Sequence, residues 1–207
     1  VPVFLVGTYA TLLPEHAREH SGADRVLNGN FEESLGRLRQ RPGLGDTENI
    51  RWKNMRPAHD LLGQRDATVL QTSRGCPFHC QYCASRILHR KYETRDPVSV
   101  AGELEYISSL GFTDVAFYDD ALLTEPEKRI KPLLRHIAES SGPRLRFHTP
   151  NGLHASQVDS ELARLMKKTG FQTLRLSLET ISGQGKRYSS GKVTEEGFER
   201  AVRCLRE

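Results

Sequence analysis

A repeated alternation of short apolar runs and amphipathic segments constrains the fold of this 207-residue chain more than any other feature. The apolar runs predict strands, and the segments with apolar residues at every third or fourth position predict helices. From Ala67 onward we expect strands at 67–72, 114–118, 145–148 and 173–178, each followed by a helix. Four such units at intervals of roughly 30 residues predict an α/β fold with a parallel sheet, the early part of a TIM-type (β/α) barrel.

The expected helices begin with residues that typically cap helices. Asp96 precedes Pro97, the order typical of an N-cap and the first helical position. Thr124 and Glu127 have the spacing of a capping box, which predicts that the second helix begins at Thr124. The third helix is expected after Ser156 and Asp159, and the fourth spans 194–206.

In barrels of this kind, functional residues gather at the carboxyl ends of the strands. The first strand leads into Arg74-Gly75-Cys76-Pro77-Phe78-His79-Cys80-Gln81-Tyr82-Cys83, where three of the four cysteines have the spacing C-x3-C-x2-C. The other strands end in Tyr118-Asp119-Asp120, in His148-Thr149-Pro150-Asn151-Gly152 and in Ser177-Leu178-Glu179-Thr180. We therefore expect one polar site at this edge of the sheet.

The three clustered cysteines indicate a metal site. Thiolates are soft ligands, typical of zinc or of an iron–sulfur cluster. A closed structural zinc site or a complete ferredoxin-type cluster uses four protein ligands, but the fourth cysteine, Cys204, lies far along the chain in an expected helix. Cys76, Cys80 and Cys83 therefore predict a cubane cluster with one iron that no cysteine holds. A zinc site with His79 as the fourth ligand is the alternative.

The C-x3-C-x2-C motif, with the aromatic Tyr82 before its last cysteine, resembles the signature of the radical S-adenosylmethionine (radical SAM) superfamily. The resemblance implies an enzyme whose 4Fe-4S cluster binds SAM at the open iron and cleaves it reductively to methionine and a deoxyadenosyl radical. It also implies an external one-electron reductant, such as a flavodoxin or a ferredoxin, and a small-molecule or peptide substrate. A non-catalytic iron–sulfur or zinc-binding module is the alternative function.

The same resemblance assigns residues to SAM. It places Tyr82 near the adenine, and Asp119 and Asp120 where the family has a Gly-Gly-Glu motif that contacts the ammonium group, with Asp120 aligned to the glutamate. Ser177 and Glu179 match an element that contacts the ribose or the methionine part. Two structural roles remain as alternatives: Asp119 as the cap of the following turn, and Glu179 in an ion pair at the barrel mouth.

The first 40 residues have a separate strand–helix–strand–helix pattern, with strands at 1–6 and 23–27 and helices at 10–20 and 31–39. This order is typical of a doubly wound sheet. Residues 6–15 resemble the last part of a cobalamin-binding domain. The resemblance implies the end of a Rossmann-like cobalamin-binding domain at 1–40, a linker at 41–66 and the first four units of a radical SAM barrel at 67–207. A flavodoxin-like unit without cobalamin is the alternative.

Composition excludes several classes of protein. The 30 Lys and Arg against 26 Asp and Glu give a net charge of +4, too small to favour a nucleic-acid partner. No apolar run approaches the ~20 residues of a membrane span. Clustered thiols and the absence of a signal peptide favour a cytoplasmic protein. Since the sequence starts at Val1 in a strand-like run and stops at Glu207 in a helical one, we expect an internal fragment.

Overall fold

A computed structural model describes residues 1–32, 52–140, 144–181, 188 and 193–207 of the chain. Its centre is a four-stranded sheet in the order β3–β6–β7–β9. These strands are β3 (Ala67–Leu70), β6 (Asp114–Phe117), β7 (Arg146–His148) and β9 (Phe171–Thr173). All three pairings are parallel. The predicted parallel α/β fold is confirmed, and the described strands form an open sheet rather than a closed barrel.

The expected strand at 173–178 is two short strands. β9 pairs with β7, and β10 (Leu176–Ser177) forms a separate parallel pair with β8 (Leu153–His154). Between them, the Arg175 amide donates to the hydroxyl of Thr149, at 3.2 Å, rather than to a backbone carbonyl. This side-chain contact interrupts the backbone hydrogen bonds between β9 and β7. After it, the chain pairs with β8 instead.

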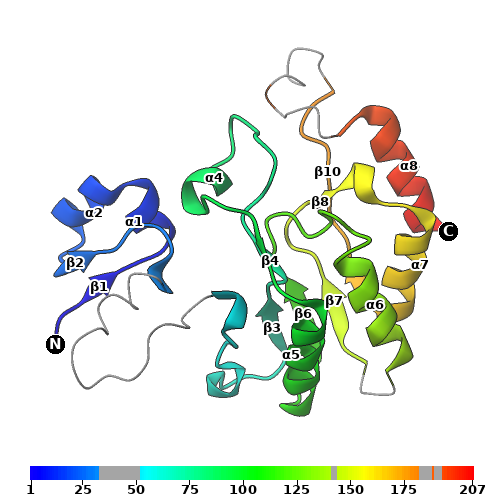
Figure 1. Ribbon diagram of the computed structural model, residues 1–207, viewed down its shortest axis with the longest axis horizontal. Helices are drawn as coiled ribbons and strands as arrows, with labels where there is room; N and C mark the ends of the chain where they lie inside the picture. Colours follow the sequence, from blue (N-terminus) through cyan, green and yellow to red (C-terminus); the bar gives the residue numbers. More distant parts are fainter. Residues whose placement is uncertain (33–51, 141–143, 182–187, 189–192) are drawn as a thin grey trace.

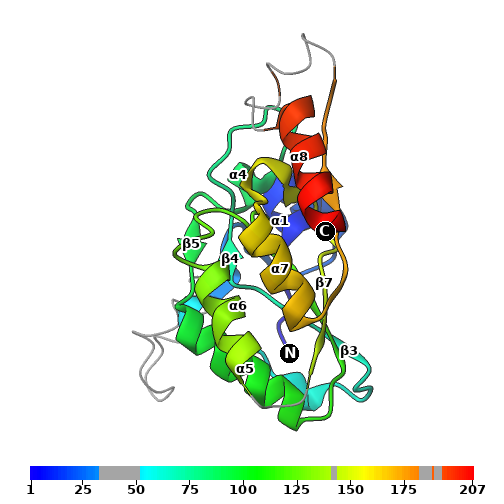
Figure 2. The same cartoon turned by 90° about the vertical axis from the view of Figure 1, so that its right-hand side faces the viewer.

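Four helices follow the strands and lie on one side of the sheet (Figures 1 and 2). They are α5 (Pro97–Ser109), α6 (Ile130–Glu139), α7 (Ser160–Thr169) and α8 (Glu195–Arg206), and each packs against the next. The core between sheet and helices contains stacked phenylalanines, with the rings of Phe117 and Phe171 5.5 Å apart and Phe147 beside both. On the other side of the sheet, Val69 is half exposed.

The predicted caps Asp96 and Asp159 are confirmed, and Thr194, where the fourth helix was expected to begin, is also an N-cap. Asp96, Asp159 and Thr194 accept backbone hydrogen bonds at the starts of α5, α7 and α8, with distances of 3.0, 2.7 and 3.1 Å. Asp159 is the N-cap of α7, which begins at Ser160.

The capping box expected at Thr124 is wrong. Residues 124–129 form turns, Glu125 has a φ of 49°, and α6 begins only at Ile130. The physical reason is Arg129, which has a non-helical backbone and a buried side chain that reaches Thr72 and Tyr92. Because this side chain is drawn into the interior, regular helical geometry starts after it.

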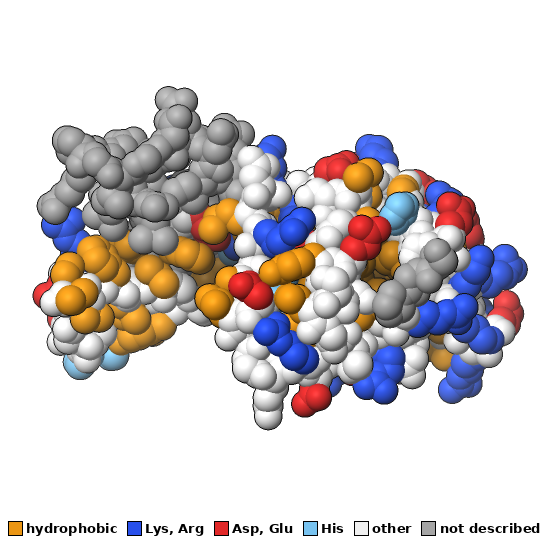
Figure 3. All heavy atoms as spheres, turned by 90° about the horizontal axis from the view of Figure 1, so that it is seen from below, with side chains coloured by type: hydrophobic (Ala, Val, Ile, Leu, Met, Phe, Trp, Pro, Cys, Tyr) orange, Lys and Arg blue, Asp and Glu red, His pale blue; other side chains and the backbone are white. Residues whose placement is uncertain are grey.

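The N-terminal unit is a parallel pair of strands, β1 (Phe4–Leu5) and β2 (Arg25–Val26), with two helices. The single helix expected at 10–20 is divided into α1 (Thr8–Leu12) and α2 (Pro14–His20), because Pro14 has no N–H to continue the first helix and instead opens the second. Exposed apolar side chains gather on this unit, at the left of Figure 3.

The linker expected at 41–66 is described only in part. It includes two short 3-10 helices, η1 (Trp52–Asn54) and η2 (His59–Leu61). Residues 33–39 of the expected helix and residues 41–51 of the linker lie outside the described residues, so the division into domains stays a prediction. In the described part of the chain, no helix is both long and apolar enough to cross a membrane.

Candidate functional site: the cysteine loop

The three clustered cysteines lie on a loop that leaves the carboxyl end of β3. Strand β4 (Ser73–Arg74) pairs in antiparallel fashion with β5 (Glu93–Thr94), so the two ends of the loop are held together at its base. Within it, α4 (Ser85–Leu88) forms one helical turn directly after the last cysteine (Figure 1). We call residues 75–92 the cysteine loop. The sequence did not predict this closing hairpin.

The thiols of the cysteine loop differ in exposure. Cys80 is buried, Cys76 is half-buried and Cys83 is exposed, and none of the chain's four cysteines forms a disulfide. Cys204 is elsewhere, on α8, with its sulfur 3.6 Å from the hydroxyl of Ser160. The cysteine loop therefore offers three thiols to a metal and no fourth. This is the set of ligands needed by a 4Fe-4S cluster with one iron that no cysteine holds.

The zinc alternative requires His79 as its fourth ligand. Among the residues that the structure describes, no three His, Cys, Asp or Glu side chains are placed to hold a single ion. His79, the fourth ligand of that alternative, is exposed, and its Nδ1 lies 3.2 Å from the cationic guanidinium of Arg86. A cubane places its thiolates on different irons, so its ligands lie further apart than those of one ion.

Asp120 holds the start of the cysteine loop. One carboxylate oxygen accepts a hydrogen bond from the amide of Gly75 at 3.0 Å and lies 4.0 Å from Nε2 of His89, while the other accepts from the hydroxyl of Ser85 at 3.4 Å. Gly75 has a φ of +79°, and a side chain there would place its Cβ 2.6 Å from the carbonyl oxygen of Lys91. The Asp120 side chain remains 28% exposed, so it also faces solvent.

Asp119 points the other way. Its fully buried carboxylate accepts hydrogen bonds from the amide and hydroxyl of Thr72 and from the hydroxyl of Ser73, and lies 3.7 Å from the guanidinium of Arg129. Burial raises the pKa of this carboxyl above its usual value, against the lowering effect of those hydrogen bonds. Asp119 therefore fixes the backbone that enters the cysteine loop, and its contact with SAM stays a prediction.

Tyr82 interacts electrostatically with Glu179 and with the thiols of Cys80 and Cys83. The Tyr82 side chain is 59% exposed and forms a hydrogen bond with Cys80. Its pKa is raised, first by partial burial, then by that hydrogen bond and by the negative charges of Glu179 and of the neighbouring cysteines. The structure therefore brings the end of the fourth strand region to the cysteine loop, although a contact of either residue with SAM stays a prediction.

The other expected residue at this edge, Ser177, ends β10. It packs against Gly152, where an added Cβ would lie 1.8 Å from the Ser177 hydroxyl, so the loop after β7 passes directly over this strand. The nearby ring of His154 on β8 packs against Phe78 of the cysteine loop, with centroids 4.4 Å apart. Both strand ends thus adjoin the cysteine loop, and a role of Ser177 with SAM stays a prediction.

Two functional neighbours, Ser85 and Arg129, were not predicted from the sequence, and Asn151 lies in the polar segment that was expected at this edge of the sheet. Ser85 follows Cys83 by two residues, a spacing that signals a hydroxyl near the sulfur. Asn151 donates to the backbone carbonyl of Asp119 at 3.0 Å, and Arg129 reaches Thr72 across the fold. No local pattern predicts these last two contacts, because they join residues that are far apart in sequence.

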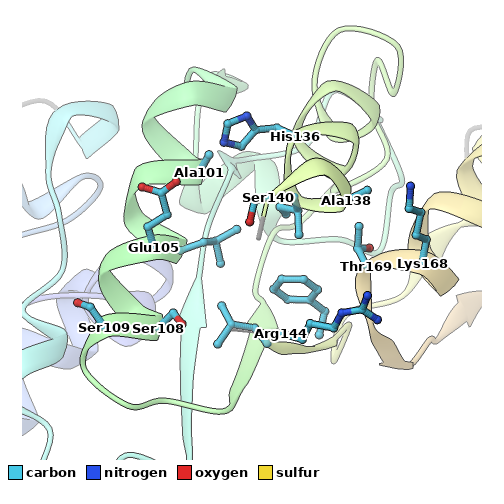
Figure 4. Close-up of a pocket in the computed structure, with 14 residues that line it drawn as sticks. Ala101, Glu105, Ser108, Ser109, His136, Ala138, Ser140, Arg144, Lys168 and Thr169 are labelled. Atoms are coloured by element: carbon cyan, nitrogen blue, oxygen red, sulfur yellow. The ribbon is translucent and has the colours of Figure 1, made fainter. Parts of the chain in front are cut away.

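An apolar cavity of about 350 Å³ lies between α5 and α6 (Figure 4). Its walls include Leu104, Ile137 and Phe147, with Arg144 and Lys168 at the rim. The rim residues come just before β7 and β9, so the cavity is at the amino ends of the strands. It is therefore separate from the cysteine loop, which leaves the carboxyl end.

The chain is similar in sequence to known proteins. The sequence profile described as "Radical SAM superfamily" matches residues 70–207. The chain is 29% identical over 188 residues to an uncharacterised methyltransferase of Synechocystis, covering 84% of this chain and 35% of that protein. It is 25% identical over 198 residues to the hopanoid C-3 methylase of Methylococcus capsulatus, covering 84% and 37%.

Solved structures give the same fold. The radical SAM methyltransferase TsrM of Kitasatospora setae, solved with cobalamin and a [4Fe-4S] cluster bound, superposes with a TM-score of 0.58 at 24% identity, covering 67% of this chain and 26% of that chain. The chain spans about a third of the length of the curated relatives that it matches over most of its length. Because the family profile covers two thirds of its residues, including the cysteine loop, the chain belongs to the radical SAM superfamily of enzymes.

Proposed function

We propose that this chain binds a 4Fe-4S cluster through Cys76, Cys80 and Cys83 and uses it to cleave SAM reductively. The observation that carries the proposal is the cysteine loop: three thiols without a fourth, on a loop closed by the β4–β5 pair, at the carboxyl end of a parallel sheet. When bound, the cluster supplies one electron to SAM, and SAM supplies the radical or the methyl group.

The protein's own residues would bind and orient these groups. Gly75 and Asp120 fix the first turn of the loop, and the packing of Phe78 on His154 fixes its middle. The burial of Cys80 and its hydrogen bond with Tyr82 keep water from that sulfur. The exposed carboxylate of Glu179, beside Tyr82, is an acceptor for the ammonium or hydroxyl groups of SAM.

We further propose that the reaction is a methyl transfer that depends on cobalamin, with residues 1–40 as the end of a cobalamin-binding domain, 41–66 as a linker and 67–207 as the radical SAM barrel. The names of the relatives support methyl transfer, and the parallel β1–β2 pair supports a doubly wound unit.

A contact between the two regions supports their joint action. Arg74, the residue before the cysteine loop, binds Glu32 of the N-terminal unit at 2.9 Å, and its guanidinium lies 4.7 Å from the ring centre of Trp52 in the linker. An external reductant such as a flavodoxin or a ferredoxin would supply the electron, and the substrate would be a small molecule or a peptide. Reduced thiols favour the cytoplasm.

Anaerobic reconstitution tests the cluster. We expect about four irons per chain and a cluster spectrum that changes when SAM is added. Cys80→Ala should lose the cluster, whereas the matched control Cys204→Ala should retain it, because Cys204 lies on α8. Retention of one zinc, with no response to SAM, would instead support a non-catalytic zinc module.

Purification from cells supplied with cobalamin tests the second part. The full-length protein should copurify with cobalamin and transfer label from methyl-labelled SAM to a product. A protein that binds the cluster and SAM but no cobalamin would contradict the cobalamin dependence and leave the cluster assignment standing.

A further inference from the structure

A single hydroxyl lies between a cysteine of the loop and an acidic residue. The Cys83 thiol donates a hydrogen bond to Oγ of Ser85 at 3.4 Å, and the Ser85 hydroxyl lies 3.4 Å from one carboxylate oxygen of Asp120. The other Asp120 oxygen accepts from the amide of Gly75 at 3.0 Å. The three side chains form a short series, sulfur to hydroxyl to carboxylate, in which Asp120 links the start of the cysteine loop at Gly75 to its middle at Ser85.

This arrangement changes when Cys83 binds a metal. A metal-bound cysteine is a thiolate without a proton, so it turns from a donor into an acceptor. A serine hydroxyl has one proton to donate, and it then has two negative acceptors, the Cys83 sulfur and the Asp120 carboxylate. At 3.4 Å the contact with Asp120 is longer than the distance of about 2.8 Å usual for such bonds, so the hydroxyl is free to turn toward the sulfur.

We propose that Ser85 sets the reduction potential of the cluster by donating a hydrogen bond to the Cys83 sulfur, and that Asp120 limits this bond by competing for the same proton. The inference rests on the proposed cluster and assigns two positioning residues to it. Hydrogen bonds to cluster sulfurs and nearby charges are established determinants of potential.

The two residues act in opposite directions. Reduction adds one negative charge to the cluster, so a hydrogen bond donated to a sulfur stabilises the reduced form and raises the potential. The negative charge of Asp120 disfavours the reduced form, and its claim on the Ser85 proton weakens the stabilising bond. Removal of the hydroxyl should therefore lower the potential, and removal of the Asp120 charge should raise it.

Four variants test this in the anaerobically reconstituted full-length protein. Ser85→Ala removes the donor, and Ser85→Thr retains it. Asp120→Asn removes the charge but keeps an oxygen that accepts from Gly75. The control is Ser109→Ala, which removes an exposed hydroxyl that donates to the Tyr106 carbonyl at the far end of α5.

The readout is the fraction of reduced cluster, measured by electron paramagnetic resonance in a redox titration without SAM. We expect Ser85→Ala to lower the ratio of reduced to oxidised cluster at a fixed potential by up to about tenfold, or about 59 mV for one electron. Asp120→Asn should change the ratio in the opposite direction, and Ser85→Thr and Ser109→Ala should match the wild type.

The outcomes separate this inference from the proposed function. If the wild type holds the cluster and Ser85→Ala has the wild-type midpoint, or if Asp120→Asn shifts the ratio in the same direction as Ser85→Ala, the inference is overturned and the cluster assignment stands. A wild-type protein that binds no cluster overturns both. Iron content, measured for each variant, identifies a shift that comes from lost cluster, and such a shift counts against the inference.

Discussion

The two ends of strand β6 carry aspartates in opposite environments. At the amino end, Asp114 is partly exposed and is bound by Arg146 and by Nε2 of His148 at 2.8 Å, and the hydrogen bonds from Arg146 hold its pKa below the usual value. Just past the carboxyl end, Asp119 is fully buried and its pKa is raised by burial.

The second arrangement costs stability, because a buried carboxylate loses its hydration. The chain offsets this cost with the donors of Thr72 and Ser73 and with the charge of Arg129. Thr72 and Ser73 lead directly into the cysteine loop. The difference between the two ends indicates that the carboxyl end uses buried polar contacts to fix the loop, whereas the amino end uses partly exposed pairs that link neighbouring strands of the sheet.

The comparison predicts its largest effect for Asp119→Ala. Loss of this carboxylate leaves the guanidinium of Arg129 buried without a charged partner, so we expect the free energy of unfolding to fall by about 3–5 kcal/mol. Asp114→Ala, at the other end of β6, should cost about 1 kcal/mol, since its partner Arg146 is mostly exposed. Urea unfolding of the two variants measures both values, and equal losses would contradict the proposed difference between the ends.

A second prediction concerns Gly75. Its left-handed backbone costs a residue with a side chain about 1–2 kcal/mol, and the added Cβ would contact the Lys91 carbonyl at 2.6 Å. Gly75→Ala should therefore lower both stability and iron content after reconstitution. Gly102→Ala is the control, because a Cβ there has open space in α5 and should raise stability by about 0.5–1 kcal/mol. Full iron loading of Gly75→Ala would show that the turn does not position the ligands.

The sequence predicted the features that depend on local patterns. The caps Asp96 and Asp159, the apolar strands and the spacing of the three cysteines are each readable within a few residues. Alternation carries a further signal: Val115, Phe117 and Asp119 are all buried, so Asp119 continues the inward-facing positions of β6 and Asp120 does not. This two-residue period predicts that Asp119 and Asp120 face opposite sides of the sheet.

Features that depend on distant contacts were not predictable in the same way. The two-residue strands β4 and β5 are too short to show any periodicity, yet they close the cysteine loop. The capping pattern at Thr124 failed because Arg129 is held by Thr72, 57 residues earlier in the chain. Tertiary contacts of this kind override local propensity, and they are concentrated around the candidate site.

The smallest predicted effect concerns pH and the amino end of β6. Because the folded-state pKa of Asp114 is depressed, its pair with Arg146 contributes stability above the unfolded-state pKa of about 3.9 and loses that contribution as the pH falls through the lower folded-state value.

Arg146→Gln should therefore cost at most about 1 kcal/mol at neutral pH, since the arginine is 58% exposed, and progressively less as the solution is acidified. Urea unfolding of both proteins from neutral pH to well below about pH 3 measures this convergence, because the contribution is lost between the unfolded-state and the lower folded-state pKa of Asp114. Arg203→Gln, whose contact with Glu199 is 3.8 Å long and exposed on both sides, should differ little from the wild type at any pH. A loss that stays constant with pH would mean that Arg146 stabilises the sheet by packing rather than by charge, and the electrostatic contrast between the two ends of β6 would then rest on Asp119 alone.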